Sequence, residues 1–289
     1  MSGNLQRLAD VTILVFVVST MLSMGMSQAL ADVVAPLRKP SRVARALAVN
    51  FIAAPLLAVI LVRIVPLAPA HASGMLLIGT AAGAPFLPKL AAMSRLNAAC
   101  AVALMVLLMG GSLVFMPLAV PWLVPGLSAD PAAIARPLLM FMVIPLAVGF
   151  ALALAGKSWT KPVLGFTRIV SSAAFVLLIV LMTGLNFATI ASAVGSFAIG
   201  TYALYLVALA AIGYLAAATD RDTQKVFALA AAGRNIPAAL VVAGASREDG
   251  GIAASLVIAF VVSLVVLLPL ARALRPREQP ARTDERLAM

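Results

Sequence analysis

An arginine stands in the middle of a stretch that is apolar enough to lie in lipid. In the segment 226–246, Arg234 is flanked by Gly233 and Asn235, and Pro237 follows three residues later. Pro237 cannot donate the backbone hydrogen bond that a continuous helix needs, so we predict a helix break here. A broken backbone at membrane depth is tolerated only where protein or a water-filled cavity covers it. A charged side chain beside such a break therefore indicates a binding site.

A lysine lies beside a second predicted break. Pro85 and Pro88 stand three residues apart, two glycines precede them, and Lys89 follows directly. Two prolines this close together interrupt a helix. All ten acidic residues of the chain lie in loops, at the ends of apolar segments or in the C-terminal tail. Broken helix ends offer unpaired amide and carbonyl groups, and two basic side chains beside them favour an anion.

Simpler explanations exist for both basic residues. Arg234 could extend toward water from a helix end, although it lies near the centre of its apolar run. Lys89 could belong to a proline-kinked helix and extend toward the membrane surface past Arg95. We favour a binding site because paired Gly/Pro-interrupted segments in two halves of a chain indicate an inverted-repeat transporter whose site lies between the breaks.

The composition indicates a membrane protein. Hydrophobic residues make up 63% and charged residues 11% of the 289 residues, and the mean hydropathy is +1.10. We predict an all-α polytopic membrane protein in which residues 1–274 form one transporter domain and residues 275–289 form a disordered cytoplasmic tail. Nine hydrophobic segments are expected, at about 9–30, 43–65, 73–92, 96–123, 137–155, 165–187, 194–217, 224–245 and 250–273.

Several functions are excluded by the residue types of the chain. Its single cysteine, Cys100, lies in an apolar run and cannot form an intrachain disulfide, and its one histidine, His71, is expected in a short loop. No predicted span holds a carboxylate pair, a Ser–His set or metal-ligand spacing, so we predict neither an enzyme nor a bound cofactor. The basic residues behind the net charge of +11 fall mostly in short loops. Membrane topology explains this placement without a nucleic-acid partner.

The basic residues also predict the orientation in the lipid bilayer. With the N-terminus outside, 15 of the 21 Lys and Arg residues fall inside and 4 outside, and the remaining two are Lys89 and Arg234. The inside count includes Arg168, near the start of the sixth segment. Because cytoplasmic loops carry an excess of Lys and Arg, we predict an outside N-terminus and a cytoplasmic C-terminus in the plasma membrane, the inner membrane of a bacterium.

Five stretches of the chain, in their order and spacing, resemble the bile acid:sodium symporter family. They are the Met-Gly-rich segment 21–30, the basic loop 37–40, the run 50–58 with its Asn-Phe and Pro-Leu-Leu-Ala, the Gly/Pro-rich segment 79–88, and Ala232-Gly233-Arg234-Asn235, where the family typically reads Gly-Met-Gln-Asn. The resemblance is to a bacterial-type member of this family, and it runs over most of the chain.

The resemblance implies a fold of ten helices in two inverted five-helix repeats. A core domain would contain two broken helices that cross, and a panel domain would move relative to the core. This chain begins at what would be the second helix of the family, so the two repeats are expected at about 9–123 and 137–273. The activity implied is secondary transport by alternating access.

The family's sodium sites are altered in this chain. The resemblance places sodium ligands at Asn50, Phe86, Leu87 and Ala230 and near Cys100 and Leu104, and Arg234 stands where the family has a glutamine. Sodium needs several oxygen ligands, preferably including a carboxylate, and most of these positions no longer supply one. We therefore expect Lys89 and Arg234 to stand in for the sodium ions, with carbonyl groups of the half-helices accepting hydrogen bonds from the guanidinium.

We expect a sodium-independent secondary transporter of a small organic anion. The residues expected at the substrate are Lys89, Arg234, Asn235, Pro85, Pro88, Gly233 and Pro237. One alternative is a sodium-coupled, bile-acid-like symporter that binds sodium through backbone carbonyls, Asn50 and Thr80. Another is a regulatory or channel-like membrane protein that does not transport. The sequence leaves open the identity of the substrate, the direction of transport, and whether the protein is a monomer or a homodimer.

Cysteine labelling tests the predicted orientation. In a Cys100→Ala background, a cysteine at position 2 should react with an impermeant maleimide in intact cells. A cysteine at position 280 should react only after the membrane is opened, because the basic loops place the tail inside. Labelling of both positions from the same side would contradict the nine-segment topology.

Overall fold

The computed structural model describes residues 2–27, 38–124, 127, 130–156, 158–185, 187, 195–218, 220–245 and 251–276. Within these residues the chain is helical, apart from turns, short connections and one isolated β-bridge. The helices are, in order, α1 (Ser2–Ser27), α3 (Pro40–Ala48), the π-helical turn η2 (Val49–Ala53), α4 (Ala54–Ile64), α5 (Pro69–Thr80), α6 (Leu87–Met93), α7 (Ala98–Leu123), α8 (Pro131–Leu138), the π-helical turn η3 (Leu139–Val143), α9 (Ile144–Leu154), α10 (Thr160–Leu185), α12 (Ala198–Ala217), α13 (Arg221–Ala232), α14 (Ile236–Ala245) and α15 (Gly251–Ala273).

The predicted all-α, membrane-spanning architecture is confirmed. Among the described residues, seven helical runs are long and apolar enough to cross a membrane, namely Arg7–Ser27, Pro40–Ile64, Ala98–Leu123, Pro131–Leu154, Thr160–Leu178, Ala198–Ala217 and Gly251–Ala273. The predicted segments 73–92 and 224–245 are each divided into two short helices, α5 with α6 and α13 with α14. Residues 28–37 and 277–289, which hold the end of the first predicted segment and most of the predicted tail, lie outside the described residues.

Helix α10 begins at Thr160, so Arg168, which the charge count assigned to the inside, lies within a membrane-length helix. One sequence prediction needs correction. His71 lies within α5 and is buried, because tertiary hydrogen bonds hold it there. Its Nδ1 atom is 2.9 Å from the Ser255 hydroxyl, and the Tyr202 hydroxyl is 2.7 Å from the same oxygen. This polar cluster joins α5, α12 and α15.

Both π-helical turns end where a proline interrupts the hydrogen-bond ladder. Pro55 follows η2 and Pro145 follows η3, each as the second residue of the next α-helix. Proline has no N–H to donate to the preceding turn, and a widened turn accommodates the unpaired carbonyl. The first of these turns contains Asn50, which is buried and whose Nδ2 donates to the Ala46 carbonyl at 3.0 Å. The turn therefore fixes the direction of the Asn50 side chain.

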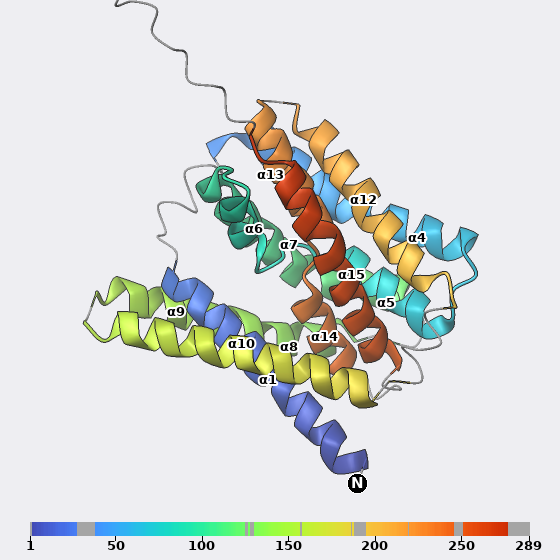
Figure 1. Ribbon diagram of the computed structural model, residues 1–289, viewed down its shortest axis with the longest axis horizontal. Helices are drawn as coiled ribbons and strands as arrows, with labels where there is room; N and C mark the ends of the chain where they lie inside the picture. Colours follow the sequence, from blue (N-terminus) through green and yellow to red (C-terminus); the bar gives the residue numbers. More distant parts are fainter. Residues whose placement is uncertain are drawn as a thin grey trace, which may run out of the picture.

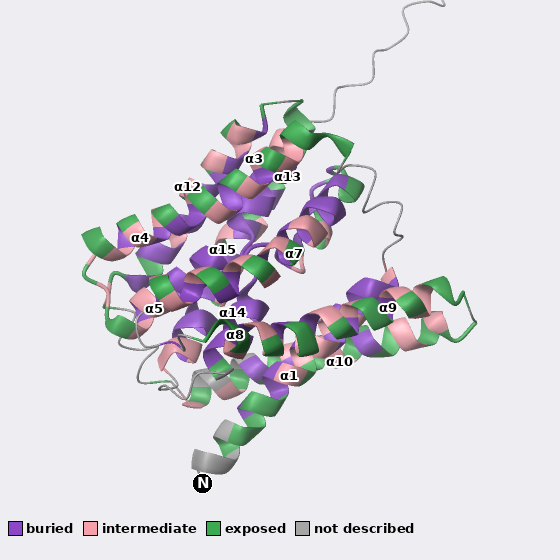
Figure 2. Cartoon of the chain, turned by 180° about the vertical axis from the view of Figure 1, so that it is seen from behind, coloured by how far each residue is buried: buried purple, intermediate pink, exposed green. Residues whose placement is uncertain are grey.

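The helices form two groups. Helices α1, α9 and α10 pack side by side in what we call the three-helix layer, and α3–α7 with α12–α15 form the main bundle (Figure 1). Buried residues concentrate in the main bundle, whereas α9 and α10 are buried over little of their length (Figure 2). In a bilayer the exposed apolar side chains of α9 and α10 can face lipid, so the layer needs no other cover.

Two glycines allow the backbones of α1 and α9 to touch. The Cα atoms of Gly25 and Gly149 lie so close that a Cβ built on either glycine would come within 2.9 Å of the other Cα. Small residues at such a crossing permit the close helix packing that is favoured in membranes. This contact holds α1 against α9 and thereby fixes one wall of the cavity described below.

We expect Gly149→Ala to lower the midpoint of thermal unfolding in detergent. The added methyl group would overlap backbone atoms of α1, and overpacking of this kind costs about 1–3 kcal/mol. Gly165→Ala on α10 is the matched control, since a Cβ there has no neighbour within 4 Å. Equal melting of the two variants would contradict the close crossing.

Candidate functional site

The two interruptions predicted from the sequence are helix breaks that contact one another. One break separates α5 from α6, and the other separates α13 from α14. An isolated antiparallel bridge pairs Ala82 with Arg234 across the breaks. Next to it, the Asn235 amide donates to the Ala81 carbonyl at 2.9 Å. Backbone groups that a continuous helix would have satisfied internally are therefore paired between the breaks.

Local sequence explains why the first break is stable. Gly83 adopts a φ of +82°, which side chains with a Cβ rarely allow. A Cβ at this position would also lie 2.8 Å from the Met105 carbonyl oxygen in α7. The Ser112 hydroxyl of α7 accepts from the Ala82 amide at 2.8 Å and donates to the Ala82 carbonyl at 3.0 Å. One hydroxyl thus satisfies both polar groups of a residue that lies outside any helix.

Arg234 is completely buried where the two breaks meet. Its guanidinium group donates to four oxygen atoms, each supplied by the protein: the Ile78 carbonyl at 2.8 Å, the Gly79 carbonyl at 2.9 Å, the Asn50 Oδ1 at 2.9 Å and the Ala231 carbonyl at 3.3 Å. These bonds match the sequence expectation that half-helix carbonyls accept from the guanidinium.

The charge of Arg234 is balanced by the ends of two helices. Ile78 and Gly79 belong to the last turn of α5, and Ala231 belongs to the last turn of α13. Helix C-termini carry partial negative charge and leave carbonyl groups unpaired. A planar guanidinium can bind several such carbonyls at once because its donors are fixed in one plane. Arg234 therefore fastens α5, α13 and η2 together at one point.

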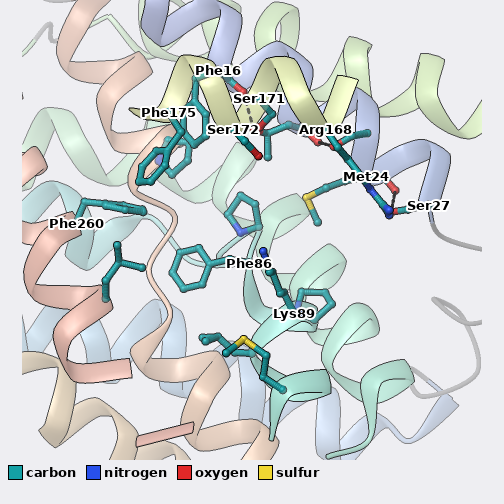
Figure 3. A pocket seen from close by; sticks show the side chains of 18 of the residues that line it. Phe16, Met24, Ser27, Phe86, Lys89, Arg168, Ser171, Ser172, Phe175 and Phe260 are labelled. Atoms are coloured by element: carbon teal, nitrogen blue, oxygen red, sulfur yellow. Dashed lines mark hydrogen bonds between the residues drawn. The ribbon is translucent and has the colours of Figure 1, made fainter. Parts of the chain in front are cut away.

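A cavity of about 730 Å³ lies between the three-helix layer and the main bundle (Figure 3). Its walls come from α1, α10, α6 with the preceding break, α14 and α15. The lining residues are Phe16, Thr20, Ser23, Met24, Ser27, Pro85, Phe86, Pro88, Lys89, Leu90, Met93, Arg168, Ser171, Ser172, Phe175, Pro237, Phe260, Leu264 and Leu268. No acidic residue is among these described residues, whereas two basic residues are.

Some of the residues expected at the substrate line this cavity. They are Lys89, Pro85, Pro88 and Pro237, together with Phe86, which was expected at a former sodium position. Of the other former sodium positions, Leu87, Cys100, Leu104 and Ala230 are buried and apolar, Asn50 is buried and polar, and none of them lines the cavity. Among the described residues, no three His, Cys, Asp or Glu side chains are grouped to hold a metal ion.

Three other expected substrate residues, Gly233, Arg234 and Asn235, lie behind the cavity wall. None of them lines the cavity. Asn235 is fully buried, its Oδ1 accepts from the Ala238 amide at 3.2 Å, and its Nδ2 has no hydrogen-bond partner. The structure therefore separates the two basic residues: Lys89 faces the cavity, and Arg234 is enclosed by protein.

Sequence reasoning missed the contribution of α1 and α10. Arg168, Ser171, Ser172 and Phe175 recur at helical spacing on one face of α10, and that face lines the cavity. A hydrogen bond of 2.6 Å between Thr20 and Ser171 joins α1 to this face. The signal was present, since Arg168 lies within the predicted segment 165–187, where a basic residue is as unusual as Lys89.

A known protein family matches about the first two thirds of the chain. The model of the sodium bile acid symporter family matches residues 12–193, which is more than half of the 289 residues. The chain belongs to this family. The match to the symporter family begins in α1 and includes Asn50, the first break and Arg168, while the second break lies beyond it. A search of curated proteins found no significant match. Family membership and seven membrane-length helices support a membrane transporter of the bile acid symporter type.

Replacing Arg234 by methionine should lower stability strongly. Arg234→Met leaves the buried Gly79 carbonyl and the Asn50 Oδ1 without the donor that Arg234 supplies, and an unpaired buried polar group costs about 1–3 kcal/mol. We expect a clear drop in the thermal unfolding midpoint of the purified protein in sodium-free buffer. Arg63→Met, at an exposed position near the end of α4, is the control. If both variants melt like the wild type, the hydrogen bonds of Arg234 contribute little.

Proposed function

We propose that this protein is a sodium-independent secondary transporter of a small organic anion, which binds in the cavity between the three-helix layer and the main bundle. The observation that carries the proposal is the set of four oxygen atoms around the Arg234 guanidinium. Oxygen atoms of this kind are the ligands that hard cations take in proteins. Here a cation that is covalently part of the chain uses them.

The charge of the cavity supports an anionic substrate. Lys89 is exposed and lines the cavity, and no acidic side chain accompanies it among the described lining residues. A cavity of about 730 Å³ falls within the range of small-molecule sites, which are mostly apolar with a few placed polar groups. An organic anion supplies both the apolar surface and the charge that such a site needs.

The position of the cavity supports alternating access. It lies between two helix groups, so a movement of the three-helix layer against the main bundle would open it or close it. We assign the layer, with α8, to the panel domain and the main bundle to the core domain, with the contacting breaks as the crossing. The predicted inverted repeats at about 9–123 and 137–273 are part of this proposal, as is an inner-membrane location with the N-terminus outside.

A sodium-coupled organic anion symporter is the second candidate, because the family is named for sodium. Asn50 and Thr80 would have to supply ligands. Asn50 Oδ1 is already an acceptor for Arg234, and the Thr80 hydroxyl donates to the Leu77 carbonyl at 2.8 Å. The Thr80 oxygen keeps its lone pairs for a cation, but sodium at Asn50 would compete with the Arg234 guanidinium. This competition favours a sodium-independent transporter over this alternative. A transport assay tests the non-transporting hypothesis.

The response of stability to sodium should separate wild type from Arg234→Gln. Glutamine removes the cation but leaves the four oxygen atoms and adds its own carbonyl. Sodium should then stabilise the variant, by about 1.4 kcal/mol at ten times its dissociation constant. The wild type should melt at the same temperature in sodium chloride and choline chloride. Arg234→Met, which adds no oxygen, is the control. A saturable rise in the wild-type melting temperature with sodium would contradict the proposal.

Transport itself is tested in proteoliposomes. Uptake of labelled organic acids, offered as a panel, should be saturable for at least one compound and equal in sodium chloride and choline chloride. Lys89→Gln should slow this uptake about tenfold, since a charge-assisted contact of about 1.4 kcal/mol is lost. Absence of saturable uptake for the entire panel would support the non-transporting alternative.

A further inference from the structure

We infer that the cavity selects organic dicarboxylates with an apolar body of about the size of a phenyl ring. In this assignment Lys89 and Arg168 bind the two carboxylates from opposite sides of the cavity, and four phenylalanine rings cover the body. The inference rests on the proposed function and specifies the substrate class of that same site.

Two basic side chains reach the cavity from different helix groups. Lys89 comes from α6 in the main bundle, and Arg168 comes from α10 in the three-helix layer. Figure 3 shows Lys89 extending into the cavity and Arg168 across from it, near Met24 and Ser27. Within the described part of the chain, neither side chain makes a hydrogen bond or an ion pair, and no acidic residue lines the cavity. Both cations are therefore available to a ligand.

Two cations without counter-ions favour two negative charges. A ligand with one carboxylate engages only one of these two cations, both of which are exposed side chains. A second carboxylate engages the other cation through further charge-assisted hydrogen bonds. The Ser172 hydroxyl also lines the cavity and can donate to a carboxylate without adding charge. The Thr20 and Ser171 hydroxyls line it too, but Thr20 already donates to the Phe16 carbonyl and Ser171 to Thr20.

Phenylalanine rings line the end of the cavity that lies away from Arg168. Phe175 lies 4.8 Å from Phe260 and 5.4 Å from Phe16, and Phe86 lies 6.2 Å from Phe260, measured between ring centroids. Figure 3 shows Phe175 and Phe260 on the side of the cavity away from Arg168 and Ser27. The rings come from α1, α10, α15 and the first break, so they span both helix groups. A hydrophobic body would bury against them while its carboxylates face the cations.

Three probes separate the two features of the site. Phenylsuccinate carries both the ring and two carboxylates, 3-phenylpropionate lacks one carboxylate, and succinate lacks the ring. Binding to the purified wild-type protein is measured by calorimetry at pH 7.5. We expect phenylsuccinate to bind at least about tenfold more tightly than either of the others, because each lacks one group that the site is built to bind.

Substitutions test which residues cause the preference. Arg168→Gln and Lys89→Gln should each reduce phenylsuccinate affinity about tenfold and bring it close to that of 3-phenylpropionate. Lys161→Gln removes a basic charge from the same helix as Arg168 but outside the cavity lining, and should change nothing. Phe175→Ala should weaken phenylsuccinate but not succinate. The double variant Lys89→Gln/Arg168→Gln should lose less than the sum of the two single losses if one ligand contacts both.

Different failures have different meanings. Binding of all three probes without preference for phenylsuccinate overturns this inference and leaves the proposed anion transporter standing. Retention of the preference in well-folded Arg168→Gln removes Arg168 from the site and also overturns the inference. Binding of none of the three anions to the wild type overturns both the inference and the proposed function.

Discussion

The placement of one guanidinium group in the interior governs much of this structure. Arg234 could not be buried in a continuous helix, where backbone carbonyls already accept hydrogen bonds from the next turn. Breaks in α5/α6 and α13/α14 free carbonyl groups at two helix ends, and the widened turn η2 adds the Asn50 side chain. Burying the guanidinium costs free energy, and so does leaving carbonyl groups unpaired at the helix breaks. The hydrogen bonds between the guanidinium and these carbonyls reduce both costs.

This arrangement also explains why the cavity is a separate site. The guanidinium of Arg234 is satisfied behind the cavity wall, so the charged groups that remain for a ligand are Lys89 on one helix group and Arg168 on the other. The wall between the two sites is the first break itself, whose prolines and Phe86 face the cavity while Ala82 pairs with Arg234. A change in the contents of the cavity can therefore act on the contact between the breaks through a few residues of backbone.

The sequence predicts those features that depend on local chemistry. Both helix breaks follow from glycine and proline, and the carbonyl partners of Arg234 follow from the helix ends that such breaks create. The sequence did not predict that Arg168 lines the cavity or that His71 is buried. Both facts depend on which helices pack together: α10 is turned toward α6 across a gap, and α12 and α15 enclose His71 with Tyr202 and Ser255. Periodicity within one helix carries no information on its neighbours.

A cation that is part of the chain cannot dissociate, and this has a consequence for energetics. A symporter that binds free sodium gains the free energy of each ion that it releases inside, whereas the Arg234 guanidinium returns with the protein in every cycle. An inside-negative potential of 100 mV opposes the entry of a monoanion by about 2.3 kcal/mol, and that of the inferred dicarboxylate by about 4.6 kcal/mol. Such a protein would move its substrate outward, or exchange one anion for another, more readily than it would accumulate it.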